Sequence, residues 1–431
     1  MNPNTRIAAI AALGVLLAPI AAAETAGDTY AQALIAGALS RHPDVVGLTM
    51  HVTPKSGKDN VIVASNVAPL GKVADTDDLK VIKSGEAIVE PSITPGRVSV
   101  ELPLLDASRR TVGALGVQFA SSPILDREAL TERAGRVRDE LARRISHVAN
   151  LTEPARYDAR VPLNNYGQQL VDRALDGHPE IQILALHANV PKTTDNVIVA
   201  SNIGRIGKAG DEDDLRLIRT EKPNLEVNTE GNRFEVELVL RDVSGSNIGA
   251  IGIVYGYKPG DDKLKLQAKA EAVLHWFGKR ITSAGNLFEP VPFVQSPPAA
   301  PYAQQLVDST LARNPDVLIL ALHVMPPSRT DPVIIASNIG RIGKKADEDD
   351  LGVIRTAKPL LEVNEAGNRF EVEVALQDSA GQTIGAVSSV FAYKPGTDRA
   401  ALQARGERIR DDLRSAIPAA SKLFEPARPA G

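Results

Sequence analysis

The chain has 431 residues, with 49 Lys or Arg against 53 Asp or Glu, few aromatic residues and no Cys. The near-balanced charge excludes a general polyanion binder, because nucleic acids and anionic membranes both attract a basic excess. The absence of Cys excludes disulfides, thiolate nucleophiles, Cys-ligated zinc and iron–sulfur clusters.

Residues 1–23 have the pattern of a signal peptide. Arg6 supplies a positive charge, residues 7–22 are apolar, and three alanines at 21–23 precede Glu24 as a small-x-small cleavage site. The alternative is an uncleaved anchor helix, for which the apolar stretch is only marginally long. We therefore expect a periplasmic or secreted protein with no membrane span after cleavage.

The remainder of the chain repeats itself at a spacing of 136 residues. Removing 23 residues from 431 leaves 408, which is three times 136. His51, His187 and His323 stand at this spacing, and the second and third copies agree more closely than the first. A period of this length is too long for a solenoid repeat, whose units of about 20–50 residues cannot bury a core alone. We predict three domains, at 24–159 (divergent), 160–295 and 296–431.

Each copy predicts the same order of elements, taken here from the third. A short amphipathic helix at 302–313 is followed by a buried strand at 317–324 and a second strand at 333–337. A short helix begins in the acidic run 347–350. Strands at 361–364, 369–376 and 383–393 and a long helix capped by Asp398 complete the unit.

This order predicts an α+β unit with an antiparallel sheet of about five strands, flanked by helices mainly on one face. In the stretch from Arg369 to Val374, apolar and charged residues alternate. The alternation predicts that Phe370, Val372 and Val374 face the core and that Arg369, Glu371 and Glu373 face water.

The segment from Leu240 to Ala250 has an LxDxxGxxIGA pattern, which includes Asp242, Gly245, Ile248 and Gly249. With the order of elements, it resembles the PAS-like extracytoplasmic sensor domains called Cache or PDC domains, in each of the three copies. The resemblance implies a small-molecule pocket between the sheet and its helices or loops. Such sensors normally continue into a transmembrane helix and an output domain, and this sequence shows neither.

The most distinctive stretch is a Gly-rich loop, Ser-Asn-Ile-Gly-Arg-Ile-Gly-Lys, at 201–208 and 337–344. Exposed N–H groups beside an Arg and a Lys would suit a carboxylate or phosphate. The alternative is a strand-end turn with solvated basic side chains. The candidate ligand contacts from this loop are Asn202, Arg205, Lys208, Asn338, Arg341 and Lys344. The first copy has Ala68-Pro69 in place of Gly-Arg, so we expect it to bind differently or not at all.

Further candidates come from the strands. His187 and His323 lie in an apolar strand, where a ligand or metal contact competes with a buried His that makes one hydrogen bond. No second His stands at ligand spacing within a copy, so we predict neither a metal site nor a cofactor. Tyr257 and Tyr393 end a strand and either grip a ligand or pack against the next helix; both interpretations stay open.

The acidic run Asp347, Asp349 and Asp350 lacks the Gly and distal Glu of an EF-hand loop, and we interpret it as a helix N-terminus.

No recognisable catalytic motif occurs, and the sequence predicts no enzyme. It predicts an exported, sensor-type protein that binds a small molecule, with a small anion such as a carboxylate as the expected ligand. The alternative is a non-catalytic interaction or scaffold protein whose three domains contact an envelope partner. Neither interpretation includes nucleic acid.

Overall fold

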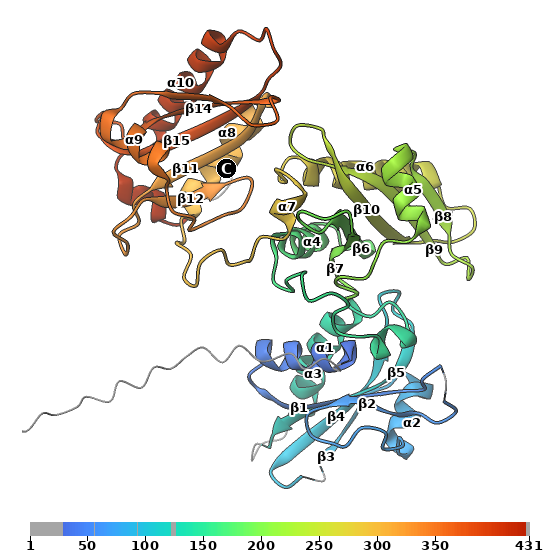
Figure 1. Cartoon of the computed structure of the whole chain (residues 1–431). Helices are drawn as coiled ribbons and strands as arrows, with labels where there is room; N and C mark the ends of the chain where they lie inside the picture. The colour runs from blue at the N-terminus through green and yellow to red at the C-terminus, as the bar shows by residue number, and fades with distance from the viewer. Residues whose placement is uncertain (1–28, 56, 93, 122–125, 428–431) are drawn as a thin grey trace, which may run out of the picture.

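The computed structural model describes residues 29–427 apart from 56, 93 and 122–125. The predicted signal peptide, residues 1–23, lies outside this part of the chain. Figure 1 shows three lobes in chain order, each built on its own sheet. Each lobe is called a unit below.

The three units repeat one series of elements. The first unit contains α1 (Tyr30–Arg41), β1 (Val45–Val52), β2 (Val61–Ser65), α2 (Thr76–Ser84), β3 (Ile88–Pro91), β4 (Arg97–Leu105), β5 (Thr111–Ala120), α3 (Arg127–Ala142) and η1 (Val148–Thr152). The second contains α4 (Tyr166–Gly177), β6 (Ile181–Asn189), β7 (Asn196–Ser201), α5 (Glu212–Thr220), β8 (Asn224–Val227), β9 (Arg233–Arg241), β10 (Asn247–Gly256), α6 (Lys263–Gly278) and α7 (Ala284–Leu287). The third contains α8 (Pro301–Arg313), β11 (Val317–Val324), β12 (Val333–Ser337), α9 (Glu348–Thr356), β13 (Leu360–Val363), β14 (Arg369–Gln377), β15 (Thr383–Ala392), α10 (Arg399–Ala416) and η2 (Ala420–Phe424).

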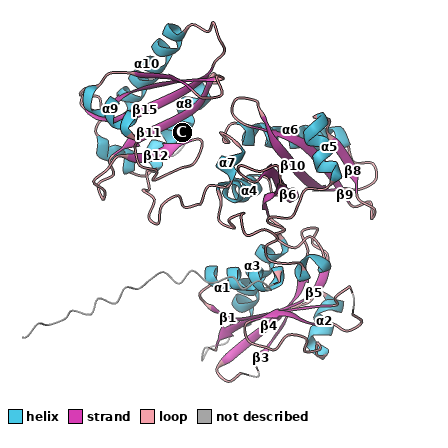
Figure 2. Ribbon diagram, viewed as in Figure 1, coloured by secondary structure: helices cyan, strands magenta, loops and turns pink. Residues whose placement is uncertain are grey.

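Each sheet has five strands, and neighbouring strands run antiparallel. The order in the first unit is β2-β1-β5-β4-β3, and the second and third units repeat it as β7-β6-β10-β9-β8 and β12-β11-β15-β14-β13. Figure 2 shows the helices packed on these sheets. The α+β fold class is confirmed, and the architecture is consistent with three tandem PAS-like domains.

The main core of a unit lies between one face of the sheet and its first and last helices. In the third unit, Phe370 and Val372 of β14 pack there with Ile409 and Leu413 of α10, all nearly inaccessible to water. Each such side chain contributes roughly 1.5–3 kcal/mol by leaving water. This face holds the unit together.

The opposite face of the sheet is covered as well. Val353 of α9 packs there against Ala375 and Ala386, in a small cluster separate from the main core. Glu373, which alternation placed in water, is only 3% exposed. The prediction of a wet face is therefore wrong, because α9 crosses over it.

The short helix begins as predicted. Asp347 is the N-cap of α9 and forms a reciprocal capping box with Asp350. Asp398 likewise caps α10. Within the described residues, no helix is long and apolar enough to cross a membrane.

Candidate functional site

The Gly-rich loop contacts the preceding unit of the chain. Gly204 and Arg205 both have positive φ angles, of 71° and 64°. A side chain at Gly204 would meet the ring of Tyr30 at 2.5 Å, so the loop approaches the first unit closely. Gly340 stands in the same relation to Tyr166 of the second unit, at 2.6 Å.

The contacts between one unit and the next are called joints below. The two predicted anion-binding arginines form ion pairs across them. Arg205 donates to both oxygens of Glu153, over 2.9 and 3.0 Å. Arg341 does the same to Glu289, with its closest contact at 2.7 Å. Burial opposes ionisation of Glu153, but the hydrogen bonds from Arg205 outweigh it and lower the pKa of that carboxyl. Each guanidinium already holds a carboxylate of the chain.

The two predicted asparagines belong to the same joints. The Asn202 side-chain amide donates to the Arg143 carbonyl at 2.6 Å, and that of Asn338 donates to the Lys279 carbonyl at 2.8 Å. Each asparagine also bonds the neighbouring strand of its own unit, because its side-chain oxygen accepts from the backbone N–H of Leu184 in β6 or Leu320 in β11.

The divergence of the first copy follows from this arrangement. Proline holds φ near −65°, so Pro69 cannot adopt the left-handed conformation of Arg205 and Arg341. It also carries no cation for an ion pair. The change falls in the one loop of the three that has no preceding copy to contact in these 431 residues.

Sequence reasoning missed a second arginine at each joint. Arg369 donates to Asp242 and to the Thr282 carbonyl, both over 2.7 Å. Its counterpart Arg233 donates to Ser108 and to the Ser146 carbonyl, both over 2.9 Å. The only sequence signal was an Arg at the start of the same strand in each copy.

Tyr257 and Tyr393 lie on the main-core side of their sheets. Tyr393 stacks on Phe370 with ring centres 5.9 Å apart, and Tyr257 packs on Phe234 at 6.0 Å. Both tyrosines therefore pack at the entry to the long helix, which was one of the two open interpretations.

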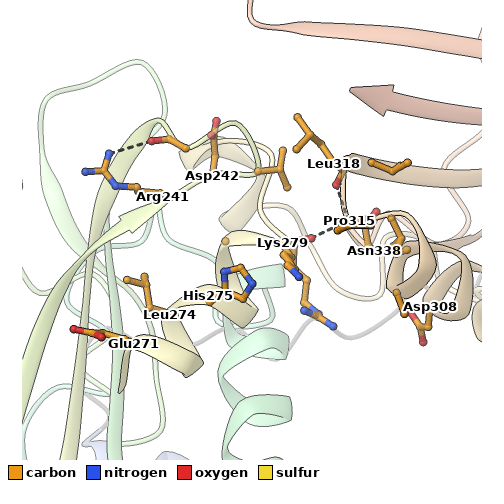
Figure 3. Close-up of a pocket in the computed structure, with 17 residues that line it drawn as sticks. Arg241, Asp242, Glu271, Leu274, His275, Lys279, Asp308, Pro315, Leu318 and Asn338 are labelled. Atoms are coloured by element: carbon orange, nitrogen blue, oxygen red, sulfur yellow. Dashed lines mark hydrogen bonds between the residues drawn. The ribbon is translucent and has the colours of Figure 1, made fainter. Parts of the chain in front are cut away.

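A cavity of about 860 Å³ lies between the second and third units, and Figure 3 shows it. Leu274 and Leu318 are among its apolar walls, and Asn338 lines it at the joint. The Asn338 amide already bonds the carbonyls of Lys279 and Leu318, so it has no donor left for a ligand.

A second cavity, of about 940 Å³, lies over the α9-side face of the third sheet. We call it the sheet-face cavity. It brings together three of the predicted site residues, His323, Arg341 and Lys344. Ala321 and His323 reach it from β11, because alternate residues of that strand face away from the main core.

The lining of the sheet-face cavity is predominantly acidic. Eight carboxyl side chains line it against four from Lys or Arg. Two of those four, Arg341 and Arg369, are the joint arginines already paired with Glu289 and Asp242. Asp242 is itself one of the eight, so seven carboxyl side chains remain beside Lys344, Lys345 and His323. The lining therefore favours positive charge within the cavity.

A histidine, an aspartate and a glutamate meet on the floor of this cavity. His323 of β11, Asp350 of α9 and Glu373 of β14 are all buried, and their ligating atoms lie within 4.8 Å of one another. The His323 Nδ1 atom contacts Asp350 Oδ1 and lies 3.8 Å from Glu373 Oε1. We call these three residues the HDE cluster.

The first two units carry the same three residue types at matching positions. His51 Nδ1 lies 3.2 Å from Asp78, and His187 Nδ1 lies 3.2 Å from Asp214. The matching glutamates have other partners: Glu101 accepts from Ser99 at 2.7 Å, and Glu237 accepts from Asn224 at 2.8 Å.

The histidines consequently differ in their acid–base behaviour. Burial lowers the pKa of His187 to about 4. Burial acts on His323 in the same direction, but Asp350 and Glu373 outweigh it and raise its pKa to about 9. Burial raises the pKa of Glu373 to about 8.

No family model matches the sequence, and no curated protein matches it. Among solved structures, the chain is similar to PelD residues 158 to the C-terminus from Pseudomonas aeruginosa PAO1, at 16% identity and a TM-score of 0.22, over 57% of this chain and 74% of that one. It is also similar to the inducer-binding domain of the PobR transcription factor from Acinetobacter in complex with 3-hydroxybenzoic acid, at 12% identity and a TM-score of 0.16, over 26% and 95%.

A third match is bacteriophytochrome RpBphP3 from the photosynthetic bacterium R. palustris, at 8% identity and a TM-score of 0.17, over 85% and 95%. TM-scores this low carry no argument about ligand or activity. The class of the protein follows from its own sheets, as a chain of three tandem α+β units with PAS-like architecture.

Proposed function

We propose that the protein is an exported, non-catalytic, small-molecule-binding protein whose third unit holds the ligand in the sheet-face cavity. The observation that carries this proposal is the cavity itself. Its volume falls in the range of small-molecule sites, about 300–1,000 Å³, and buried polar groups stand on its floor. Export is supported by the pattern of residues 1–23, and the non-catalytic role by the lack of a recognisable catalytic motif.

We further propose that the ligand is cationic. The anion was predicted from Arg205, Arg341 and their neighbouring lysines, but both arginines pair with glutamates of the preceding unit. Lys344 lines the cavity among eight carboxyl groups. The carboxylates attract a positively charged ligand and repel an anion.

Calorimetry with small amines, amino acids and carboxylates tests the proposal. Ala321 lies on the cavity wall, and Ala185 is its counterpart in the second unit. We expect cationic compounds to bind, Ala321→Leu to weaken them at least about tenfold by filling space, and Ala185→Leu to leave them unchanged. Selective binding of carboxylates would contradict the charge argument, and binding unaffected by Ala321→Leu would place the ligand elsewhere.

The joints favour a second candidate, a scaffold that presents its units in a fixed order to an envelope partner. Two arginines, an asparagine and a tyrosine act across each joint, which orients neighbouring units. Affinity purification on the immobilised protein tests it. Stoichiometric capture of one envelope protein, abolished by loosening the joints with Arg205→Ala plus Arg341→Ala, would support the scaffold.

A further inference from the structure

The HDE cluster of the third unit contains buried polar atoms that the described chain leaves without hydrogen bonds. His323 and Glu373 are 8% and 3% exposed, and neither His323 Nδ1 nor Glu373 Oε1 has a hydrogen-bond partner within the described residues. The Nδ1 atoms of His51 and His187 are unpaired there as well, so the feature particular to the third unit is the glutamate that lies beside its histidine. Buried polar atoms are nearly always paired, with protein, water or an ion. His323 Nδ1 and Glu373 Oε1 lie 3.8 Å apart, and the histidine atom also contacts Asp350 Oδ1, so the three side chains offer donor atoms in one place.

The geometry of the cluster suits a metal ion. Two ligands on a tetrahedral ion, with bonds of about 2.0–2.2 Å, stand roughly 3.4 Å apart. The separation of 3.8 Å between His323 Nδ1 and Glu373 Oε1 is close to that spacing. Asp350 Oδ1 lies nearer to His323 Nδ1 than this spacing, so the Asp350 carboxylate must turn away from the histidine when an ion enters. Asp350 Oδ2 accepts from the Asp347 backbone N–H at 2.8 Å. This hydrogen bond orients the carboxylate, as outer-shell bonds do at metal sites.

The donor set selects a class of ion. One imidazole nitrogen and two carboxylates suit zinc and the neighbouring divalent transition metals, whereas calcium and magnesium prefer oxygen donors alone. Three protein ligands leave a coordination position free, and the cavity adjoins the cluster.

We propose that His323, Asp350 and Glu373 bind one divalent transition-metal ion, such as Zn²⁺, on the floor of the sheet-face cavity. This inference rests on the proposed function, because it places an ion on the floor of the cavity that we propose for the small molecule. Its residues come from β11, α9 and β14, so the ion joins the sheet to the helix that covers it.

The other two units provide internal controls. They carry the same three residue types, but Asn224 holds Glu237 and Ser99 holds Glu101. The position of Asn224 is Leu360 in the third unit, directly opposite Glu373 on the neighbouring strand. Leucine cannot bond a carboxylate, so Glu373 is free to join the cluster. We expect one ion for each chain.

The test is calorimetric titration of the chelator-treated protein with ZnCl₂, MnCl₂ and CaCl₂. We expect one Zn²⁺ per chain, and at least a tenfold loss of affinity in Glu373→Gln and in His323→Gln. The matched variants Glu237→Gln and His187→Gln should bind as the unaltered protein does, and circular dichroism checks that every variant folds.

Zn²⁺ affinity that is unchanged in both Glu373→Gln and His323→Gln would overturn the proposal, as would a preference for Ca²⁺. If amines enter the cavity and Zn²⁺ does not bind, the metal site is wrong and the small-molecule function stands. If neither binds, both are wrong.

Discussion

The second and third units differ most instructively on the face of the sheet beneath the short helix. Both place a buried histidine beside the aspartate that closes the capping box, at His187–Asp214 and His323–Asp350. In the second unit the nearby glutamate bonds an asparagine, and in the third it turns toward the histidine. Between these two units, the residue opposite the glutamate on the neighbouring strand, Asn224 or Leu360, is therefore the difference that accounts for the cluster.

The largest effect is expected from transferring that residue into the third unit. Leu360→Asn should give Glu373 the amide partner that Glu237 has, and withdraw it from the HDE cluster. Calorimetry should show a loss of Zn²⁺ affinity of roughly 10–100-fold, the usual range for a change around a metal site. The control is Leu361→Asn, which alters an exposed leucine beside it. Equal losses in both variants would contradict the account.

The reverse exchange should create a weaker second site. Asn224→Leu frees Glu237 to approach His187 and Asp214, so we expect the number of Zn²⁺ ions per chain to rise from one to two. Native mass spectrometry counts the ions directly. A count that stays at one would mean that further differences between the units hold Glu237 away.

The stability of the second unit is predicted to depend on pH. Burial and the neighbouring carboxylates raise the pKa of Glu235 to about 7, above the value of about 4.3 in an unfolded chain. At pH values between these two pKa values, the folded state binds more protons than the unfolded state. The free energy of unfolding therefore falls as the pH rises from about 4.5 to 7. Glu235→Gln removes the buried charge and should stabilise the unit by about 1–2 kcal/mol at pH 8, with little effect at pH 4.

Thermal unfolding at both pH values checks this prediction. Glu271→Gln, which alters an exposed carboxylate of α6, serves as the control. Stabilisation of Glu235→Gln that is equal at pH 4 and pH 8 would show that the buried charge is not responsible.

The smallest effect is expected at the joints, where the two basic residues of one loop should behave differently. Arg341→Ala breaks a partly buried ion pair and should cost about 1 kcal/mol, with faster proteolysis of the linker after Glu289. Lys344→Ala should leave the joint unchanged, since within the described residues the Lys344 side chain forms no ion pair with the preceding unit. Limited proteolysis followed by mass spectrometry distinguishes the two. Equal rates of linker cleavage in the two variants would contradict the role of Arg341 in the joint.

Much of the fold could be predicted because it depends on local patterns. The strands at 317–324 and 333–337 and the caps at Asp347 and Asp398 lie where hydrophobic runs and helix-start signals placed them. Alternation in β14 correctly placed Phe370 and Val372 in the core. It failed for Glu373, because alternation identifies two faces but not a helix that later crosses the second one.

The candidate site could be predicted only in part. Arg341 was singled out for its glycines, yet its partner Glu289 lies in the preceding copy, and no pattern within one copy reveals that contact. The HDE cluster was not predicted, because no second histidine stands at ligand spacing within a copy and its acidic members are far apart in the sequence. The usable signal was that a buried-strand His, a capping Asp and a strand Glu recur together in all three copies.

The most direct test of the central claim is a crystal of the protein soaked in ZnCl₂, with anomalous diffraction recorded at the zinc absorption edge. We predict one strong anomalous peak within bonding distance of His323, Asp350 and Glu373, and none at His187 or His51. A well-occupied crystal with no peak at His323, or with peaks of equal height in all three units, would contradict the assignment of the third unit as the binding unit.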